Sequence, residues 1–363
     1  MSRPTSAIID LQALRDNFSL AQSLAPDSQS MPIVKANAYG HGTVQTAKAL
    51  AEMAPAFGVA CIEEALELRS ADIRQPILLL EGAQSADEVL VAAQENFWLM
   101  VENRPQLEAM VNTQLQKPVK VWIKLDTGMH RLGFHPEDAQ SVYQQLSSSQ
   151  NVAKQIVIAS HFACADNLTN KFTKQQLERF ESAIQTIAKP DILKSLANSA
   201  AILGWPEVRD HWQRPGYMLY GNSPFSQPQH NADRLTAVMQ FKSAVISTRN
   251  IDPGQSVGYT ANWTAQRPSS IATIAVGYGD GYPRQAPNGT PVLIQGRRCP
   301  LVGCVSMDMI TVDVTDLPQP LSIGEPVTLW GPELPVNEVA SHCGTIGYEL
   351  LTRISARVPK IYL

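Results

Sequence analysis

The chain has 363 residues, of which 44% are hydrophobic, and a formal net charge of −4. This length allows one large core and a second, smaller domain, and the slightly acidic balance argues against a nucleic-acid-binding surface. No apolar run reaches the length of a bilayer span, the first 18 residues lack the apolar core of a signal peptide, and the five scattered cysteines fit a reducing compartment, so we expect a cytoplasmic protein.

The chain begins with a short predicted strand, residues 7–9, and Asp10 can cap the helix that follows it. The next apolar run, residues 32–34, ends in Lys35, and a turn rich in glycine leads into a helical pattern after Gly42. Lys35 should therefore lie where a buried strand ends. Partial burial would lower the pKa of its amine and make it a nucleophile or base, although a lysine that merely extends to solvent from a strand end is the simpler alternative.

Short apolar strands then alternate with amphipathic helices such as 63–70 and 174–187. Eight strands are predicted, with ends near Lys35, Ala60, Glu81, Val101, Asp126, Phe162, Asn198 and Leu219. Several are almost continuously apolar, as strands covered on both faces should be. The pattern predicts an α/β fold with a (β/α)8 barrel, and a doubly wound open sheet is the alternative.

The sequence changes character after Gly221, where prolines and polar residues up to 233 indicate a linker. The following segments are rich in β-formers: 244–247, 270–276, 291–295, 310–314 and 326–329. Asn288-Gly289 is a hairpin dipeptide. We therefore expect the barrel over residues 10–229 and a mostly β domain over 230–363. The N-terminal strand 1–9 should belong to the β domain.

Polar residues gather at the predicted strand ends, where barrel enzymes carry their chemistry. They are Lys35, Tyr39, the stretch 124–133, Ser160, His161, Asn198, Ser199 and the stretch 214–217. Cations, hydroxyls and backbone amides together would suit a phosphorylated, anionic cofactor. No metal-binding spacing of histidine or cysteine occurs, so we expect no metal site.

These residues carry a resemblance to the alanine racemases of the fold-type III pyridoxal-phosphate family. The most specific matching stretch is Val34-Lys35-Ala36-Asn37-Ala38-Tyr39-Gly40-His41-Gly42. The other matching segments, in order, are 124–133, 160–162, 198–199, 214–221, 257–259, 277–281 and Met307-Asp308. The resemblance covers nearly the whole chain.

The resemblance implies a role for each of these positions. Lys35 would hold the cofactor as an internal aldimine and act as one base, and Tyr259 of the partner subunit would be the other, so that a homodimer shares its active sites. Arg214 would bond the pyridine nitrogen and keep it unprotonated, supported by His161. The phosphate would be held by Tyr39, Asn198, Ser199, Gly216 and Tyr217. Arg131 and the Met307 amide would bind the substrate carboxylate, and Lys124 matches a lysine that is carbamylated in some relatives.

The implied activity is the interconversion of L- and D-alanine, which serves either to supply D-alanine as a cell-wall precursor or to break alanine down. Two positions depart from the family pattern: Ala356 replaces a tyrosine that binds phosphate, and Cys304 replaces an arginine near the entrance. A related decarboxylase and a non-catalytic pyridoxal-phosphate-binding protein are the alternatives. Arg214 argues against the first, and the β domain with Tyr259 against the second.

Overall fold

The computed structural model describes residues 3–363, so Met1 and Ser2, at the start of the predicted segment 1–9, lie outside the described residues. The chain divides into two compact units. One unit contains 14–38 and 43–235, which we call the barrel unit. The other contains the residues up to 13 together with 39–42 and 236–363, which we call the β unit.

The barrel unit is built on parallel strands. They are β2 (Gln29–Ser30), β3 (Phe57–Val59), β4 (Ile77–Leu79), β5 (Phe97–Val101), β6 (Val121–Lys124), β7 (Val157–Ala159), β8 (Leu193–Ser195) and β9 (Trp212–Gln213). Strands β3 to β8 form one continuous sheet, and β2 pairs with β9. Two further contacts close the ring: a bridge between Ile33 and Gly58, and a hydrogen bond of 2.9 Å from the Arg214 amide to the Ala197 carbonyl. The predicted (β/α)8 barrel is confirmed, and the open-sheet alternative is wrong.

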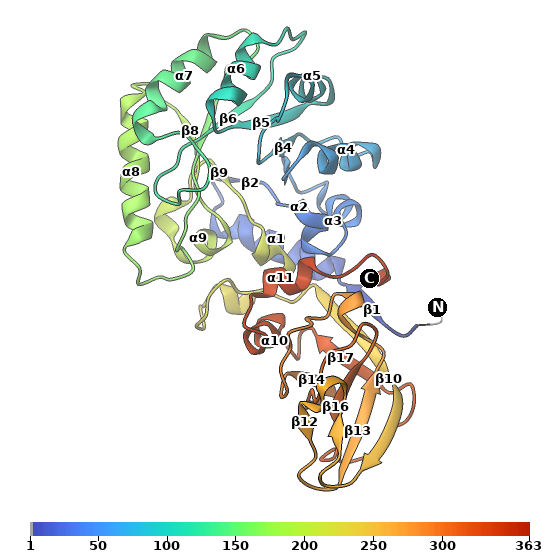
Figure 1. Ribbon diagram of the computed structural model, residues 1–363. Helices are drawn as coiled ribbons and strands as arrows, with labels where there is room; N and C mark the ends of the chain where they lie inside the picture. The colour runs from blue at the N-terminus through green and yellow to red at the C-terminus, as the bar shows by residue number, and fades with distance from the viewer. Residues whose placement is uncertain (1–2) are drawn as a thin grey trace. The chain divides into compact units, whose positions relative to one another are not determined.

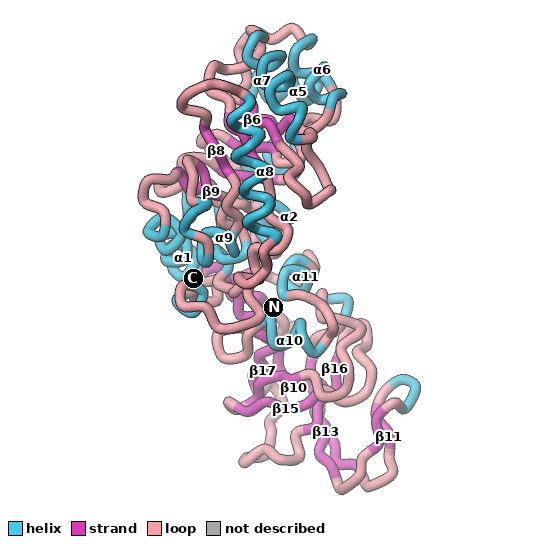
Figure 2. Tube along the Cα trace, turned by 90° about the vertical axis from the view of Figure 1, so that its left-hand side faces the viewer, coloured by secondary structure: helices cyan, strands magenta, loops and turns pink. Residues whose placement is uncertain are grey.

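Helices connect the strands and cover the outside of the barrel unit (Figures 1 and 2). They are α1 (Leu11–Leu24), α3 (Thr43–Leu50), α4 (Ile62–Ser70), α5 (Ala86–Glu95), α6 (Arg104–Asn112), α7 (Ala139–Ser148), α8 (Phe172–Thr186) and α9 (Ser199–Gly204). Their starts follow from side-chain capping. Asp10 accepts the amides of Gln12 and Ala13, both at 2.9 Å, and Ser85 and Asn103 cap α5 and α6 in the same way.

The barrel interior contains three tryptophans, Trp98, Trp122 and Trp212, whose ring centroids lie 5.4 to 6.3 Å apart. Trp212 meets the other two rings edge-to-face, and Trp98 stacks on Trp122, so an aromatic cluster fills the interior. The Lys120 amine, one residue before β6, lies 4.2 Å from the centre of the Trp98 ring. This end of the barrel is therefore filled by packing, with one cation resting on aromatic faces.

The β unit is dominated by an antiparallel sheet around the long strand β10 (Met239–Ile251). The other strands are β1 (Ser6–Ile9), β11 (Ser256–Val257), β12 (Trp263–Thr264), β13 (Ser269–Ile274), β14 (Pro291–Ile294), β15 (Arg297–Pro300), β16 (Ile310–Asp313), β17 (Pro326–Trp330) and β18 (Lys360–Tyr362). The N-terminal strand β1 pairs with β10 and with β18. Helices α10 (Val336–His342) and α11 (Gly347–Thr352) complete the unit.

Two local predictions were wrong. Asn288-Gly289 does not join paired strands; the β14–β15 hairpin turns at Gln295 and Gly296, both with positive φ, as tight hairpin turns require. The eighth barrel strand ends at Gln213 rather than near Leu219, because Pro215 has no N–H to extend the ladder and Tyr217–Tyr220 form a 3₁₀ helix. Over residues 3–363, no helix combines the length and the apolar character that crossing a membrane requires.

Candidate active site

Lys35 follows directly on the short segment that closes the barrel. The Ile33 amide donates to the Pro215 carbonyl (2.9 Å) and the Val34 amide to the Gly58 carbonyl (2.8 Å), so the backbone before Lys35 is fixed on both sides. Burial and the positive charge of Arg131 lower the pKa of the Lys35 amine. A larger fraction of the amine is thus unprotonated at neutral pH than in an exposed lysine, which suits a nucleophile or a base.

The backbone after Lys35 takes an unusual path. Ala36, Asn37, Ala38 and Tyr39 all have φ between 51° and 55°, which makes a left-handed turn (α2, Lys35–Tyr39) without a single glycine. Each such residue costs about 1–2 kcal/mol relative to a right-handed one. A strained turn of this kind persists only where its surroundings hold it.

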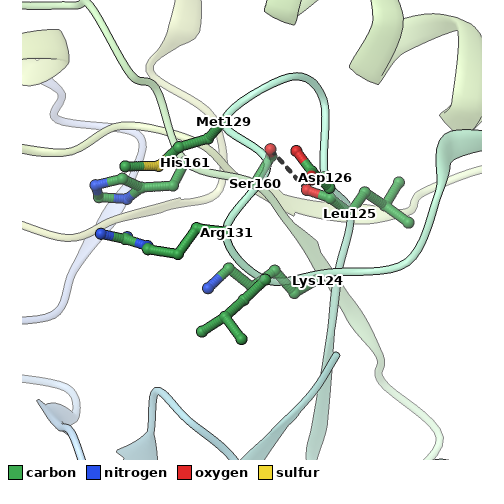
Figure 3. Close-up of a pocket in the computed structure, with 8 residues that line it drawn as sticks. Lys124, Leu125, Asp126, Met129, Arg131, Ser160 and His161 are labelled. Atoms are coloured by element: carbon green, nitrogen blue, oxygen red, sulfur yellow. Dashed lines mark hydrogen bonds between the residues drawn. The ribbon is translucent and has the colours of Figure 1, made fainter. Parts of the chain in front are cut away.

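A small pocket lies at the carboxyl ends of β6 and β7 (Figure 3). It is lined by Lys124, Leu125, Asp126, Met129, Arg131, Leu132, Ser160 and His161. Arg131 lies on a loop that returns to its starting strand, since the Phe134 amide donates to the Lys124 carbonyl at 2.9 Å. In Figure 3 the basic ends of Arg131, His161 and Lys124 point to the same side of the pocket.

Lys124 has an acidic neighbour that the sequence analysis did not identify. Its amine lies 3.4 Å from the Glu102 carboxylate, and the two side chains are only 12% and 3% exposed. Burial lowers the pKa of the Lys124 amine and raises that of the Glu102 carboxyl, while their attraction opposes both changes. Glu102 follows β5, so the pair joins the ends of two adjacent strands.

His161 is uncharged at neutral pH. Loss of solvation lowers its pKa well below the usual range, and the positive charges of Arg214 and Arg131 lower it further. A neutral imidazole can support a neighbouring guanidinium without adding to the repulsion among the cations.

Arg214 is buried and follows β9. Its two terminal nitrogens donate to the carbonyls of Ser195 (2.9 Å), Ser160 (2.6 Å) and Leu196 (3.3 Å) and to the Ser195 hydroxyl. Burial lowers its pKa to about 10, so the guanidinium stays charged at neutral pH. It therefore links the ends of β7 and β8 and carries a positive charge into the barrel.

Ser199 and Asn198 organise the segment between β8 and β9. The Asn198 side chain accepts the Ala201 amide at 3.0 Å and caps α9. The buried Ser199 hydroxyl accepts the amides of Gly216 (3.0 Å) and Met218 (3.2 Å). Four of the residues predicted to bind phosphate, Asn198, Ser199, Gly216 and Tyr217, thus lie in two segments of the barrel unit, before and after β9, which the Ser199 hydroxyl links.

The remaining predicted residues belong to the β unit. Tyr39 packs its ring 6.2 Å from that of Tyr348, and burial raises its pKa to about 12. Tyr259 is 69% exposed and Met307 53% exposed. Of the two departures from the family pattern, Ala356 is exposed, and the Cys304 sulfur accepts the Asn262 amide group at 3.2 Å.

The segment that carries Met307 is fixed by a charged network. Asp280, 1% exposed, pairs with Arg3 (2.7 Å) and Arg357 (2.8 Å). Arg357 also binds the Asp308 carboxylate at 2.8 Å and the Met307 carbonyl at 3.3 Å. The glycines of 277–281 allow this close packing, because a Cβ on Gly277 would lie 2.4 Å from the Met307 carbonyl oxygen. The glycine-rich segment is therefore a support for Met307.

Comparison with known proteins decides the family. Residues 9–224 match the model of the alanine racemase N-terminal domain, and residues 238–362 match that of the C-terminal domain. The chain belongs to the alanine racemase family. It is 50% identical over 361 residues to the alanine racemase of Pseudomonas taetrolens, with 99% of both chains covered.

Solved structures of the family have the same fold. The biosynthetic alanine racemase of Pseudomonas aeruginosa superimposes with a TM-score of 0.94 at 46% identity, covering 99% of each chain. The alanine racemase of Bartonella henselae, described with covalently bound pyridoxal phosphate, superimposes with a TM-score of 0.90 at 32% identity, again covering 99% of each chain.

The structure brings together the predicted residues of the barrel unit, because the ends of parallel strands meet at one edge. They lie close enough that the charges of Arg131 and Arg214 lower the pKa of Lys35, Lys124 and His161. The sequence analysis missed Glu102 and the Asp280 network. Glu102 stands directly after the apolar run 97–101, which could have marked it as a strand-end residue, whereas no sequence pattern indicated the network.

Proposed function

We propose that this chain interconverts L- and D-alanine with pyridoxal 5′-phosphate bound to Lys35. The observation that carries the proposal is the position of Lys35: a lysine of lowered pKa, directly after backbone that is hydrogen-bonded on both sides, among further cations. The two-domain match to the alanine racemase family supports the same activity.

The residues of the barrel unit fit this cofactor by their chemistry. Several positive charges lie close together, on Lys35, Lys124, Arg131 and Arg214. The charges of the two arginines lower the pKa of both lysines. An anionic phosphate ester would relieve that repulsion. We propose that Tyr39, Asn198, Ser199, Gly216 and Tyr217 hold the phosphate, and that Arg214, supported by His161, donates to the pyridine nitrogen.

When bound, the cofactor withdraws electrons from the substrate and makes its Cα proton acidic. The protein must then remove the proton from one face and return one to the other. We propose that the Lys35 amine serves one face and the Tyr259 phenol of the partner subunit the other. Arg131 and the Met307 amide would hold the substrate carboxylate, and so fix which face of Cα each base meets.

Activity would thus require a homodimer in which each site takes Tyr259 from the other chain. The exposure of Tyr259 and Met307 leaves both available for such an interface. In this proposal residues 10–229 bind the cofactor, and 230–363 with 1–9 complete the neighbouring site. Mixing Lys35→Ala and Tyr259→Phe chains should restore activity, because the heterodimer has one intact site. Mixtures that exchange subunits and stay inactive would contradict the shared site.

We also propose that Lys124 can be carbamylated, since its lowered pKa supplies the neutral amine that adds to carbon dioxide with loss of one proton. Glu102 competes with the modification, because an ionised carboxylate stabilises the ammonium form and repels a carbamate. Growth in ¹³C-labelled bicarbonate followed by ¹³C NMR of the protein tests this. A carbamate signal that is lost in Lys124→Met supports it, and an unlabelled Lys124 contradicts it.

The experiment that tests the activity is a panel of purified L- and D-amino acids, with products separated by chiral chromatography. We expect both alanine enantiomers to approach an equal mixture when the protein is supplied with pyridoxal phosphate. Absence of racemisation with every amino acid would contradict the proposal. We further propose a cytoplasmic enzyme. Depletion of the protein and rescue with D-alanine would distinguish a supply of D-alanine for the cell wall from a role in alanine breakdown.

A further inference from the structure

Glu64 lies near the start of α4, where two adjacent acidic residues would ordinarily face solvent. In the structure its carboxylate accepts two backbone amides. One oxygen accepts the Ala36 amide at 2.6 Å, and the other accepts the Ala60 amide at 2.8 Å. Ala36 is the first residue of the left-handed turn, and Ala60 is the first residue after β3. The carboxylate thus connects a strained turn to a strand end.

We propose that Glu64 is a positioning residue for Lys35, which clamps the left-handed turn so that the lysine amine is held at the mouth of the barrel. The inference rests on the proposed function of Lys35. It concerns a residue to which the resemblance assigns no role and which touches no reacting atom.

The clamp acts at the point where strain begins. Within the turn, the Ala38 amide donates to the Val34 carbonyl at 2.9 Å, and the Asn37 side chain accepts the Thr43 amide at 3.1 Å. These contacts hold the middle and the exit of the turn. The Ala36 amide is adjacent to Lys35, and hydrogen bonds to a charged acceptor are among the strongest that a protein makes. Loss of Glu64 should therefore loosen the lysine's own backbone first.

Glu64 also acts on the charge of Lys35. The charged groups facing the lysine are Arg131, Glu81, Glu64 and Arg214. The two carboxylates raise its pKa, against burial and the two arginines, which lower it. Replacement of Glu64 by a neutral residue should therefore lower the pKa of Lys35 further, in addition to any effect on position.

The neighbouring Glu63 provides a matched control. It is exposed and interacts with the Cys61 thiol rather than with the turn. Both residues lie in the first turn of α4, so both favour the helix to a similar degree through its dipole. Glu63→Gln removes the same charge from the same helix turn and leaves the clamp intact.

Two substitutions separate the clamp from the charge. Glu64→Gln keeps the side-chain length but has one accepting oxygen and no charge. Glu64→Asp keeps the charge but is one methylene shorter, so it cannot span both amides. Three measurements distinguish them: the pH midpoint of Lys35 acylation in cofactor-free protein by mass spectrometry, amide hydrogen exchange of the peptide containing Ala36, and kcat and KM for alanine.

We expect exchange at the turn to be about tenfold faster in both Glu64 variants, because each loses at least one charged hydrogen bond. The acylation midpoint should move to lower pH in Glu64→Gln and stay near the wild-type value in Glu64→Asp. In both, kcat should fall by about tenfold to a hundredfold with little change in KM. Glu63→Gln should match the wild type in all three measurements.

The inference is overturned if both Glu64 variants behave like Glu63→Gln. If Glu64→Gln does not fold, hydrogen exchange in Glu64→Asp decides the matter, since that variant keeps the helix-start charge. A wild-type protein that lacks racemase activity would overturn the proposed function instead. In that case the exchange measurement still reports whether Glu64 holds the turn.

Discussion

The two ends of the barrel use the same residue type in opposite ways, and both examples lie in strand β6 or directly before it. Lys120, Trp122 and Lys124 alternate along one chain segment, so they lie on the same face of the strand. Burial lowers the pKa of both lysines. At the amino end the Lys120 amine rests on Trp98 and Trp212, whereas at the carboxyl end the Lys124 amine meets Glu102, with Arg131 and Arg214 nearby.

The difference separates a packed end from the end that we propose to be reactive. Aromatic faces accommodate a cation without fixing a proton or a substrate. A cluster of cations with one buried carboxylate instead leaves positive charge that can bind an anionic ligand. Burial of these charges lowers the free energy of unfolding. Substitutions at the carboxyl end should therefore change activity, and those at the amino end should change only stability.

The largest effect is expected at Arg214. Arg214→Lys keeps the positive charge but loses the planar fork that links the ends of β7 and β8. Activity should fall by about a hundredfold, and the free energy of unfolding by about 3 kcal/mol, because buried carbonyls lose their donors. Chiral chromatography and urea unfolding measure the two effects. Arg209→Lys, which also removes guanidinium bonds to carbonyls, should cost stability alone; equal activity loss in both would break the comparison.

Lys124→Met should have the next largest effect. It leaves the Glu102 carboxylate buried without its partner, which costs about 3 kcal/mol in the free energy of unfolding. Activity should fall by about tenfold, since the charge distribution around Arg131 and His161 changes. The double substitution Lys124→Met with Glu102→Gln should recover part of the stability but not the activity. Recovery of both would mean that Lys124 serves only to neutralise Glu102.

The same substitution at the other end should do much less. Lys120→Met replaces a cation on Trp98 and Trp212 with a flexible apolar side chain of similar length. We expect activity within about twofold of the wild type and a change below about 1 kcal/mol in the free energy of unfolding. An activity loss comparable to that of Lys124→Met would show that the amino end contributes to the reactive site.

The smallest effect is a pH dependence of stability. Burial gives Lys120 a folded-state pKa below the value of 10.5 for an exposed lysine. Between these two values the unfolded chain binds more protons, so the contribution of Lys120 to the free energy of unfolding rises with pH across that interval. The free energy of unfolding of the wild type should therefore rise relative to that of Lys120→Met as the pH approaches 10.5. A constant difference would contradict the lowered pKa.

Part of the carboxyl end could be predicted from the sequence, because residues there mark the ends of apolar runs. Lys35 and Lys124 each follow such a run, and parallel strands bring their carboxyl ends to one edge. Arg214 follows Trp212-Gln213 rather than an apolar run, so the end of the eighth strand was predicted too late in the chain. The left-handed turn was not predictable, since the alanines and tyrosine after Lys35 ordinarily favour other conformations. The sequence did not single out Glu64, because two adjacent glutamates at a helix start ordinarily face solvent. The two amides that its carboxylate accepts are set only by how the end of β3 and the turn approach one another.

The most direct test of the account is the position of the covalent bond to the cofactor. The purified protein is incubated with pyridoxal phosphate, reduced with borohydride, digested and mapped by mass spectrometry. The account predicts one stable pyridoxyl label, on the peptide containing Lys35, and no label there in Lys35→Ala, which should also be inactive. A label on Lys124 or another lysine, or no label at all, would contradict it.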